Sequence, residues 1–152
     1  MNILDTSALI NYIEKSNALP KAVYFITSDI ENEIFTTEID FNTEINDNIR
    51  VISENSFFNE SRYLNNYYYI LNKHSGRSFY NMTGFGDISI MALIKTLIEA
   101  EKDCFQQQLP LKELKENLVV YVDDIGLKKR IVKEFKQDIE TRVNVLLSNE
   151  MK

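Results

Sequence analysis

Cysteine and histidine, the side chains that most often build zinc and redox sites, are almost missing from this 152-residue sequence. It holds one cysteine, Cys104, and one histidine, His74. A conventional tetrahedral zinc site is therefore excluded, because such sites take most of their ligands from these two residue types. A single cysteine also forms no internal disulfide, which predicts a reducing, cytoplasmic location.

Glycine and proline are scarce as well, with four and two residues, which argues against a long linker. No apolar run approaches the roughly 20 residues of a membrane span, and the amino terminus lacks the basic region of a signal peptide. Hydrophobic residues make up 44% of the chain and charged residues 26%, which is an ordinary globular composition. We expect one domain over residues 1–152 with no membrane association.

Positive charge is in deficit, because 17 Lys and Arg face 23 Asp and Glu for a net charge of −6. This balance disfavours nucleic-acid binding driven by bulk charge. It leaves open an acidic site that attracts phosphate through the charge of a bound cation.

The first ten residues are the most informative stretch of the chain. A short apolar run ends on Asp5, the hydroxyl residues Thr6 and Ser7 follow at once, and apolar residues then repeat at helical spacing through Ile13. This pattern predicts a buried strand, a turn and a helix, with Asp5 at the carboxyl end of the strand, where open α/β sheets bind ligands. A buried carboxylate is costly unless its charge is compensated, which a metal ion would do.

A second strand and helix are predicted after Pro20. Residues 22–27 form an apolar, β-rich run. Ser28 and Glu31 then have the spacing of a capping box, which predicts a helix that continues into residues 35–37. Glu33 falls in the second turn of this helix, close to the carboxyl end of the preceding strand.

The middle of the chain gives weaker signals. Residues 49–52 alternate as a minor or edge strand would, and Ser56 is expected to open a helix that continues through Leu71. Residues 73–77 are expected to form a basic loop. Asp87 follows a turn with two glycines and starts a strongly periodic helix, whose dipole favours a carboxylate in its first turn.

The carboxyl-terminal third opens with a continuous apolar run over residues 118–122. Such a run is typical of a parallel strand buried on both faces. It ends on Asp123 and Asp124, and apolar residues spaced by four then predict a last helix that reaches Val143.

Alternating strands and helices predict an α/β fold with a parallel sheet covered by helices. With right-handed connections, the acidic residues after the strands converge on one edge of that sheet. Clustered carboxylates repel one another without a cation, and a set of oxygen ligands suits Mg²⁺ or Mn²⁺. Phosphodiester hydrolysis is the chemistry that such a site supports.

The ordered set of motifs resembles the PIN domains, metal-dependent nucleases that include the toxins of VapBC-type toxin–antitoxin pairs. The resemblance spans nearly the whole chain and rests on four stretches, Asp5–Ile10, Ser28–Ile34, Asp87 with Ala92, and Val122–Asp124 with Leu127. It implies a three-layer α/β/α fold with a mainly parallel sheet, and an endoribonuclease that cleaves single-stranded or looped RNA. An antitoxin protein and a second copy of the chain are the partners that it implies.

The resemblance also implies the residues of the site. It makes Asp5, Glu33, Asp87 and Asp124 the ligands of Mg²⁺ or Mn²⁺ and the catalytic acids, with Glu33 either a ligand or a base that orients water. Ser7, or Thr6 in its place, would be the hydroxyl that supports Asp5. Three other acidic residues compete with Glu33 for its role, namely Asp29, Glu31 and Glu38.

The last motif departs from the pattern of the family. Val122 stands where the family usually has Thr or Ser, which removes a hydroxyl and leaves Asp123 in competition with Asp124. The spacing to Leu127 favours Asp124.

Two other functions are weighed against a nuclease. Val122 and the acidic composition fit a catalytically inactive PIN-like module that binds RNA or protein. Acidic strand ends also serve Mg²⁺-dependent phosphotransfer enzymes, but these usually carry a second Asp two residues after the first, where this chain has Ser7. Each acidic residue alone would also fit a simple helix cap, and no nucleophile-elbow pattern surrounds any serine that His74 would activate.

Overall fold

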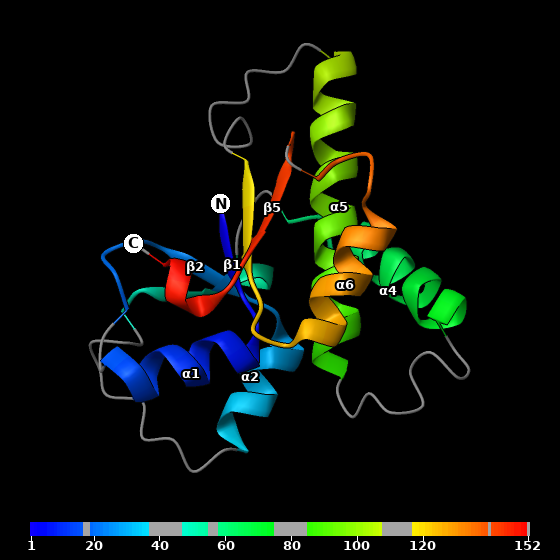
Figure 1. Ribbon diagram of the computed structural model, residues 1–152. Coiled ribbons are helices and arrows are strands. Elements are labelled where there is room, and N and C mark those ends of the chain that lie inside the picture. Colours follow the sequence, from blue (N-terminus) through cyan, green and yellow to red (C-terminus); the bar gives the residue numbers. More distant parts are fainter. Residues whose placement is uncertain are drawn as a thin grey trace.

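A five-stranded, fully parallel sheet forms the centre of the protein in a computed structural model (Figure 1). The structure describes residues 1–16, 19–36, 47–54, 58–74, 85–107, 117–139 and 141–151. The strands lie side by side in the order β3-β2-β1-β4-β5. Their bounds are β1 Asn2–Leu4, β2 Tyr24–Ile26, β3 Ile49–Val51, β4 Leu118–Tyr121 and β5 Val143–Leu146. The predicted edge strand near residue 49 is confirmed as β3.

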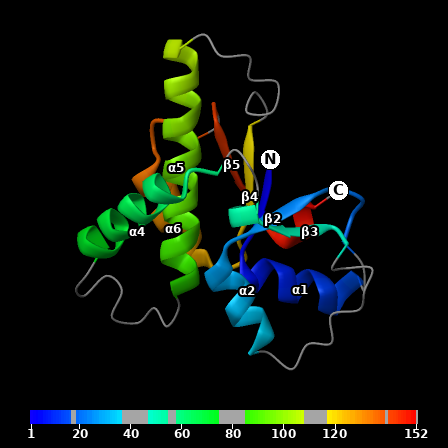
Figure 2. The ribbon, with the colours of Figure 1, turned by 180° about the vertical axis from the view of Figure 1, so that it is seen from behind.

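Helices pack on this sheet and complete a three-layer α/β/α fold, as predicted. Figures 1 and 2 show α4, α5 and α6 grouped beside the sheet, with α1 and α2 near the carboxyl ends of the strands. The helices of the described part are α1 Thr6–Ser16, α2 Ser28–Phe35, α4 Glu60–His74, α5 Phe85–Gln107 and α6 Ile125–Glu134, with short 3₁₀ helices η1 Ile52–Glu54 and η2 Ser148–Glu150. No helix among the described residues has the length and apolar character needed to cross a bilayer.

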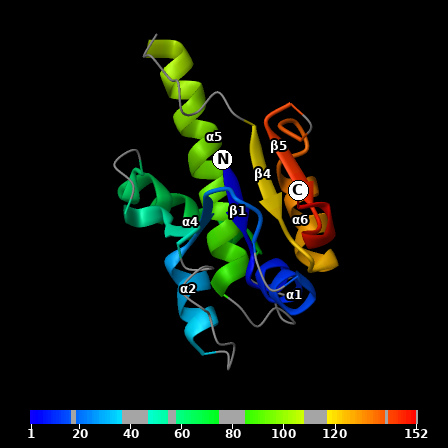
Figure 3. The ribbon, with the colours of Figure 1, turned by 90° about the vertical axis from the view of Figure 1, so that its left-hand side faces the viewer.

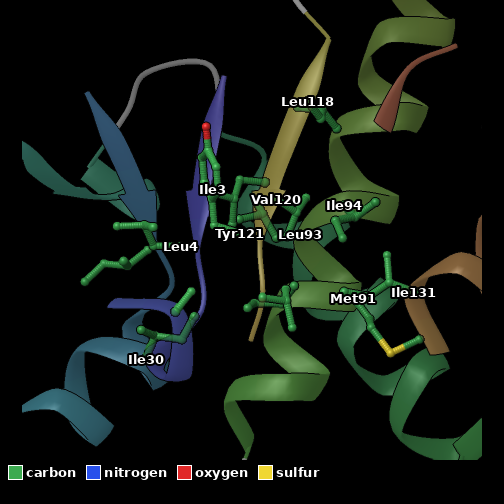
Figure 4. Packing of buried hydrophobic residues seen from close by; sticks show 14 of the residues in the cluster. Ile3, Leu4, Ile30, Met91, Leu93, Ile94, Leu118, Val120, Tyr121 and Ile131 are labelled. Atoms are coloured by element: carbon green, nitrogen blue, oxygen red, sulfur yellow. The ribbon is translucent and has the colours of Figure 1, made fainter. Parts of the chain in front are cut away.

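The core lies between the central strands and the apolar stripe of α5. Ile3 and Val120, from β1 and β4, are completely buried, as are Leu93 and Ile94 of α5. Figure 4 shows these α5 side chains packed beside Val120. The predicted periodicity of α5 is confirmed, and burial of this stripe fixes the helix against the sheet, so that its first turn lies at the carboxyl edge.

The last predicted helix is wrong in its second half. Helix α6 ends at Glu134, a turn follows over residues 135–138, and residues 143–146 form β5. The spacing of four that suggested a helix up to Val143 is coincidental there. Strand β5 pairs with β4 along its whole length, and this pairing satisfies the backbone of β4 while burying Val143.

Two predicted helix starts are also corrected. Helix α2 is capped by Thr27 rather than Ser28, because the Thr27 hydroxyl accepts a hydrogen bond from the Ile30 backbone N–H at 3.3 Å. Helix α4 begins at Glu60, and the Asn59 side chain accepts a hydrogen bond from the backbone N–H of Arg62 at 3.0 Å. The expected start at Ser56 lies outside the described residues.

The predicted basic loop over residues 73–77 is wrong in its first two residues. Lys73 and His74 belong to the last turn of α4, where cations interact favourably with the helix dipole. The remaining residues of that loop, 75–77, lie outside the described part of the chain.

Candidate functional site

Asp5 lies between the carboxyl ends of the two central strands. It follows β1 directly, and its backbone N–H donates to the carbonyl of Tyr121, the last residue of β4, at 3.0 Å. Chain connections lead from β1 toward β2 on one side, while β4 continues to β5 on the other. This reversal of strand order is where open α/β sheets form their ligand crevice, and Asp5 is buried there with 4% of its surface exposed.

Ser7 ties the ends of the same two strands together. Its hydroxyl donates to Asp5 Oδ2, and its backbone N–H donates to the same oxygen at 3.1 Å. The Ser7 hydroxyl also accepts hydrogen bonds from the backbone N–H groups of Asp123 and Asp124, at 3.3 and 3.2 Å. One side chain therefore positions both acidic strand ends, and it is Ser7 rather than Thr6 that supports Asp5.

Glu33 is held by two other elements. The Thr6 hydroxyl of α1 donates to Glu33 Oε2 at 2.6 Å, and the Gly86 backbone N–H of α5 donates to Oε1 at 3.1 Å. A Cβ atom at position 86 would lie only 2.6 Å from that carboxylate oxygen. Glycine at this position thus allows α2 and α5 to approach each other through Glu33.

Asp87 follows Gly86 in the first turn of α5, and a buried network of hydroxyls fixes this turn. The Ser89 hydroxyl donates to the carbonyl of Gly86 at 2.7 Å and lies 2.6 Å from the Thr27 hydroxyl. Sequence reasoning missed both Ser89 and the contact that Thr27 makes with it. A serine within an otherwise apolar helix face was the available signal, because a buried hydroxyl needs a partner.

The charges of the four predicted acidic residues act on one another. Burial raises the pKa of Asp87 to about 7, and the nearby charges of Asp5, Asp124 and Glu33 add to the increase, while Arg130 opposes it. The structure therefore places residues from four separate parts of the chain near one another at one sheet edge.

The pKa of Asp5 is raised to about 6, mainly by burial. Hydrogen bonds from Ser7 oppose this effect and the charge of Glu33 adds to it. Without a compensating cation, protons are held at this edge close to neutral pH.

Asp123 and Asp124 occupy different environments. The Asp123 carboxylate accepts hydrogen bonds from the backbone N–H and hydroxyl of Ser148 and from the Asn11 side chain. Burial opposes its ionisation, but these bonds prevail and lower its pKa. Asp124 is exposed, and its Oδ1 caps α6 by accepting the Leu127 N–H at 2.9 Å. Asp123 thus joins β4 to η2, while Asp124 contributes its charge to the acidic edge.

Val122, the residue that departs from the resemblance, is completely buried, and its backbone N–H donates to the carbonyl of Leu146 at 2.9 Å. Its side chain belongs to the core and supplies nothing polar to the edge.

The donor chemistry of the edge fits a hard cation, since its side chains offer only oxygen. The fit is incomplete, because the described part of the chain holds no group of three or more acidic, histidine or cysteine residues that could hold an ion. Glu33 and Asp124 already accept hydrogen bonds from the protein. The predicted four-residue ligand set therefore stays a prediction.

No protein-family model, no curated protein and no solved structure matches this chain.

Proposed function

We propose that this chain is a Mg²⁺- or Mn²⁺-dependent endoribonuclease of PIN type. One observation carries the proposal, namely that hydrogen bonds link the four acidic residues at the carboxyl edge of the sheet. Ser7 joins Asp5 to the backbone of Asp124, and Glu33 bonds to Thr6 and Gly86, the neighbours of Asp5 and Asp87. Gathering like charges at a partly buried edge opposes folding. A cation that binds there would offset this cost, and acidic edges of this kind serve phosphodiester hydrolysis.

Asp5 and Asp87 are the principal metal ligands in this proposal, because burial and mutual repulsion make them the carboxylates most in need of a counter-charge. Asp124 adds a carboxylate from the exposed side. When bound, the cation supplies charge neutralisation, polarisation of the scissile phosphate and a more acidic water.

The remaining side chains position these groups. Ser7 holds the Asp5 carboxylate through two donors, so that its orientation is set before any ligand arrives. Glu33 is fixed from both sides by Thr6 and Gly86, and we assign it to orienting the attacking water.

An RNA strand is the proposed substrate because the edge is open on one side. Asp124 is exposed and Asp87 is only partly buried, so a flexible single strand or loop can bring its backbone to them. By the same resemblance we propose that the chain is the toxin of a type II toxin–antitoxin pair with an antitoxin partner, which growth arrest on expression and rescue by a co-expressed neighbouring reading frame would test.

Calorimetric titration with Mn²⁺ tests the metal site directly. The wild-type protein is compared with Asp5→Asn and with the control Asp47→Asn, which changes an exposed residue in the turn before β3. We expect binding in the wild type and the control, and none in Asp5→Asn, with unchanged circular dichroism in all three. Cleavage of a labelled RNA should follow the same pattern, and full cleavage by Asp5→Asn would contradict the proposal.

A catalytically inactive module that binds RNA or protein is the second candidate. The absence of a metal-holding group among the described residues and the buried Val122 favour it. It predicts no Mn²⁺ binding in any variant, together with RNA or protein binding that persists in EDTA.

A further inference from the structure

We propose that the exposed basic face of α6 binds the backbone phosphates of the RNA strand that enters the acidic edge. This α6 basic face consists of Lys129 and Lys133, together with Lys136 in the turn that follows the helix. The inference rests on the proposed function, because it names how the same substrate is held outside the site.

Positive charge is concentrated here in a chain whose net charge is −6. The twelve residues from 125 to 136 hold five basic residues and one acidic residue, Glu134. Glu134 does not neutralise the α6 basic face, because its carboxylate lies 2.8 Å from the Lys73 ammonium of α4. The segment therefore presents a local charge opposite in sign to that of the whole chain.

The three lysines of the α6 basic face are exposed, and none takes part in an ion pair with another described residue. Several other cations of the described chain form ion pairs within the protein, such as Lys95, which lies 2.6 Å from Glu99. Unpaired ammonium groups in a row are suited to phosphates, which compensate their charge when counterions are released.

Stabilisation of α6 by its dipole explains only part of the distribution of lysines along the helix. A cation in the last turn interacts favourably with the helix dipole, which accounts for Lys133. The same argument does not account for Lys128 and Lys129 in the amino-terminal half. The first turn of α6 has no acidic residue to pair with them.

The position of α6 relative to the acidic edge connects the two surfaces. Asp124 is the cap from which α6 begins, and its Oδ1 accepts the Leu127 N–H at 2.9 Å. Figure 3 shows the chain passing from β4 into the start of α6 near α1. Lys129 and Lys133 are about 6 Å apart along the helix, which is close to the spacing of about 6.8 Å between every second phosphate of a stacked strand.

Two exposed apolar side chains accompany the lysines. Ile125 is 65% exposed and Val132 40% exposed. At spacings of four and three, Ile125, Lys129 and Val132 share one face of the helix. Apolar contacts beside cations suit a ligand that carries sugars and bases next to its phosphates, which single-stranded RNA does and an acidic polypeptide does not.

Fluorescence anisotropy with a labelled oligouridylate of 20 nucleotides tests the inference in EDTA, where metal-dependent cleavage cannot interfere. The variant Lys129→Gln/Lys133→Gln/Lys136→Gln is compared with Lys21→Gln/Arg50→Gln/Lys102→Gln, which removes the same charge from exposed positions elsewhere. We expect the first to bind about 10-fold more weakly and to lose about two units of the slope of log K against log salt, since each phosphate contact contributes about 0.7 for a single strand. The control should bind like the wild type.

Three outcomes of that experiment would overturn the inference. They are no binding by the wild type, unchanged binding by the α6 variant, and an equal loss in the control, which would indicate bulk charge. Competition by polyglutamate as strong as that by unlabelled oligouridylate would also overturn it, because the surface would then attract polyanions in general.

Hydrolysis of bis(p-nitrophenyl) phosphate, which is too small to reach the α6 basic face, separates this inference from the proposed function. With Mn²⁺ present, the α6 variant should hydrolyse it at the wild-type rate. No hydrolysis and no Mn²⁺ binding by the wild type would refute the nuclease and with it the premise that a substrate strand lies along α6.

Discussion

The backbone N–H of Gly86 donates a hydrogen bond to Glu33 Oε1 over 3.1 Å. Through this contact an acidic side chain of α2 lies directly against the first turn of α5, where the helix dipole favours negative charge. The Thr6 hydroxyl holds the other oxygen of the same carboxylate. The position of Asp87, the next residue, thus depends on a carboxylate from a different helix.

Gly86→Ala should destabilise the protein by about 1 kcal/mol, because the added Cβ would lie 2.6 Å from Glu33 Oε1 and displace that side chain from its hydrogen bonds. In a Glu33→Ala background the same change should be neutral or slightly stabilising, since alanine is the better helix former. A double-mutant cycle by urea denaturation measures this coupling. Additive effects would show that Glu33 and Gly86 do not meet in solution.

Ser7→Ala should cost about 1–3 kcal/mol of stability, since it removes a donor from the buried Asp5 carboxylate and an acceptor from two backbone N–H groups. The control is Ser28→Ala, at an exposed serine that starts α2 next to the cap Thr27, and it should leave stability within about 0.5 kcal/mol. Thermal denaturation of both variants checks this. Equal effects would contradict the central role of Ser7.

Asp124→Ser should lower the affinity for Mn²⁺, whereas Asp123→Asn should lower the thermal stability. Serine is also a good cap for α6, so Asp124→Ser should unfold at nearly the wild-type temperature while losing Mn²⁺ affinity. Asp123→Asn loses part of the carboxylate that Ser148 and Asn11 bind, so its midpoint should fall. Calorimetry and thermal denaturation on the same samples test the assignment of Asp124, rather than Asp123, as a metal ligand. Loss of Mn²⁺ binding in Asp123→Asn alone would reverse that assignment.

The metal-free protein should become less stable as the pH rises from 5 to 8. Asp5 and Asp87 have pKa values of about 6 and 7, above those of an unfolded chain. The folded state therefore binds more protons in this range, and the free energy of unfolding falls with rising pH. Urea denaturation in EDTA should show a decrease on the order of 1–3 kcal/mol.

The variant Asp5→Asn tests whether the Asp5 carboxylate causes part of this pH dependence. Asp5→Asn should make the pH profile shallower, with Asp87 accounting for the remaining slope, and the variant should be more stable than the wild type at pH 8. Below pH 5, protonation of Asp123, whose pKa is lowered, works in the opposite direction and should reduce stability. An Asp5→Asn protein with the wild-type pH profile would contradict the assigned pKa of Asp5.

Local patterns were sufficient to predict the strands that flank the site. Apolar runs before Asp5 and Asp123 predicted β1 and β4, and burial of both runs explains why these predictions were reliable. The periodic stripe of α5 predicted its helix for the same reason. These elements place Asp5, Asp87 and Asp124, so the acidic edge followed from the sequence once the winding of the sheet was assumed.

Features that depend on partners distant in the sequence were not predicted. Val143 continues a helical spacing, and only the presence of β4 beside it makes it a strand residue. The hydrogen bond that holds the Asp123 carboxylate comes from Ser148, which lies 25 residues further along the chain. Likewise, the contact between Glu33 and Gly86 spans 53 residues. Tertiary hydrogen bonds of this kind leave no periodic trace in a sequence.

The register of β1 against β4 has a consequence for the order in which the protein forms during synthesis. Asn2 pairs with Val119, so on this side β1 must wait for a partner strand that is made more than a hundred residues later in the chain. Non-local pairing of this kind slows folding. A chain interrupted before β4 is made therefore lacks the Tyr121 carbonyl that accepts the Asp5 backbone N–H, as well as the carboxylate of Asp124.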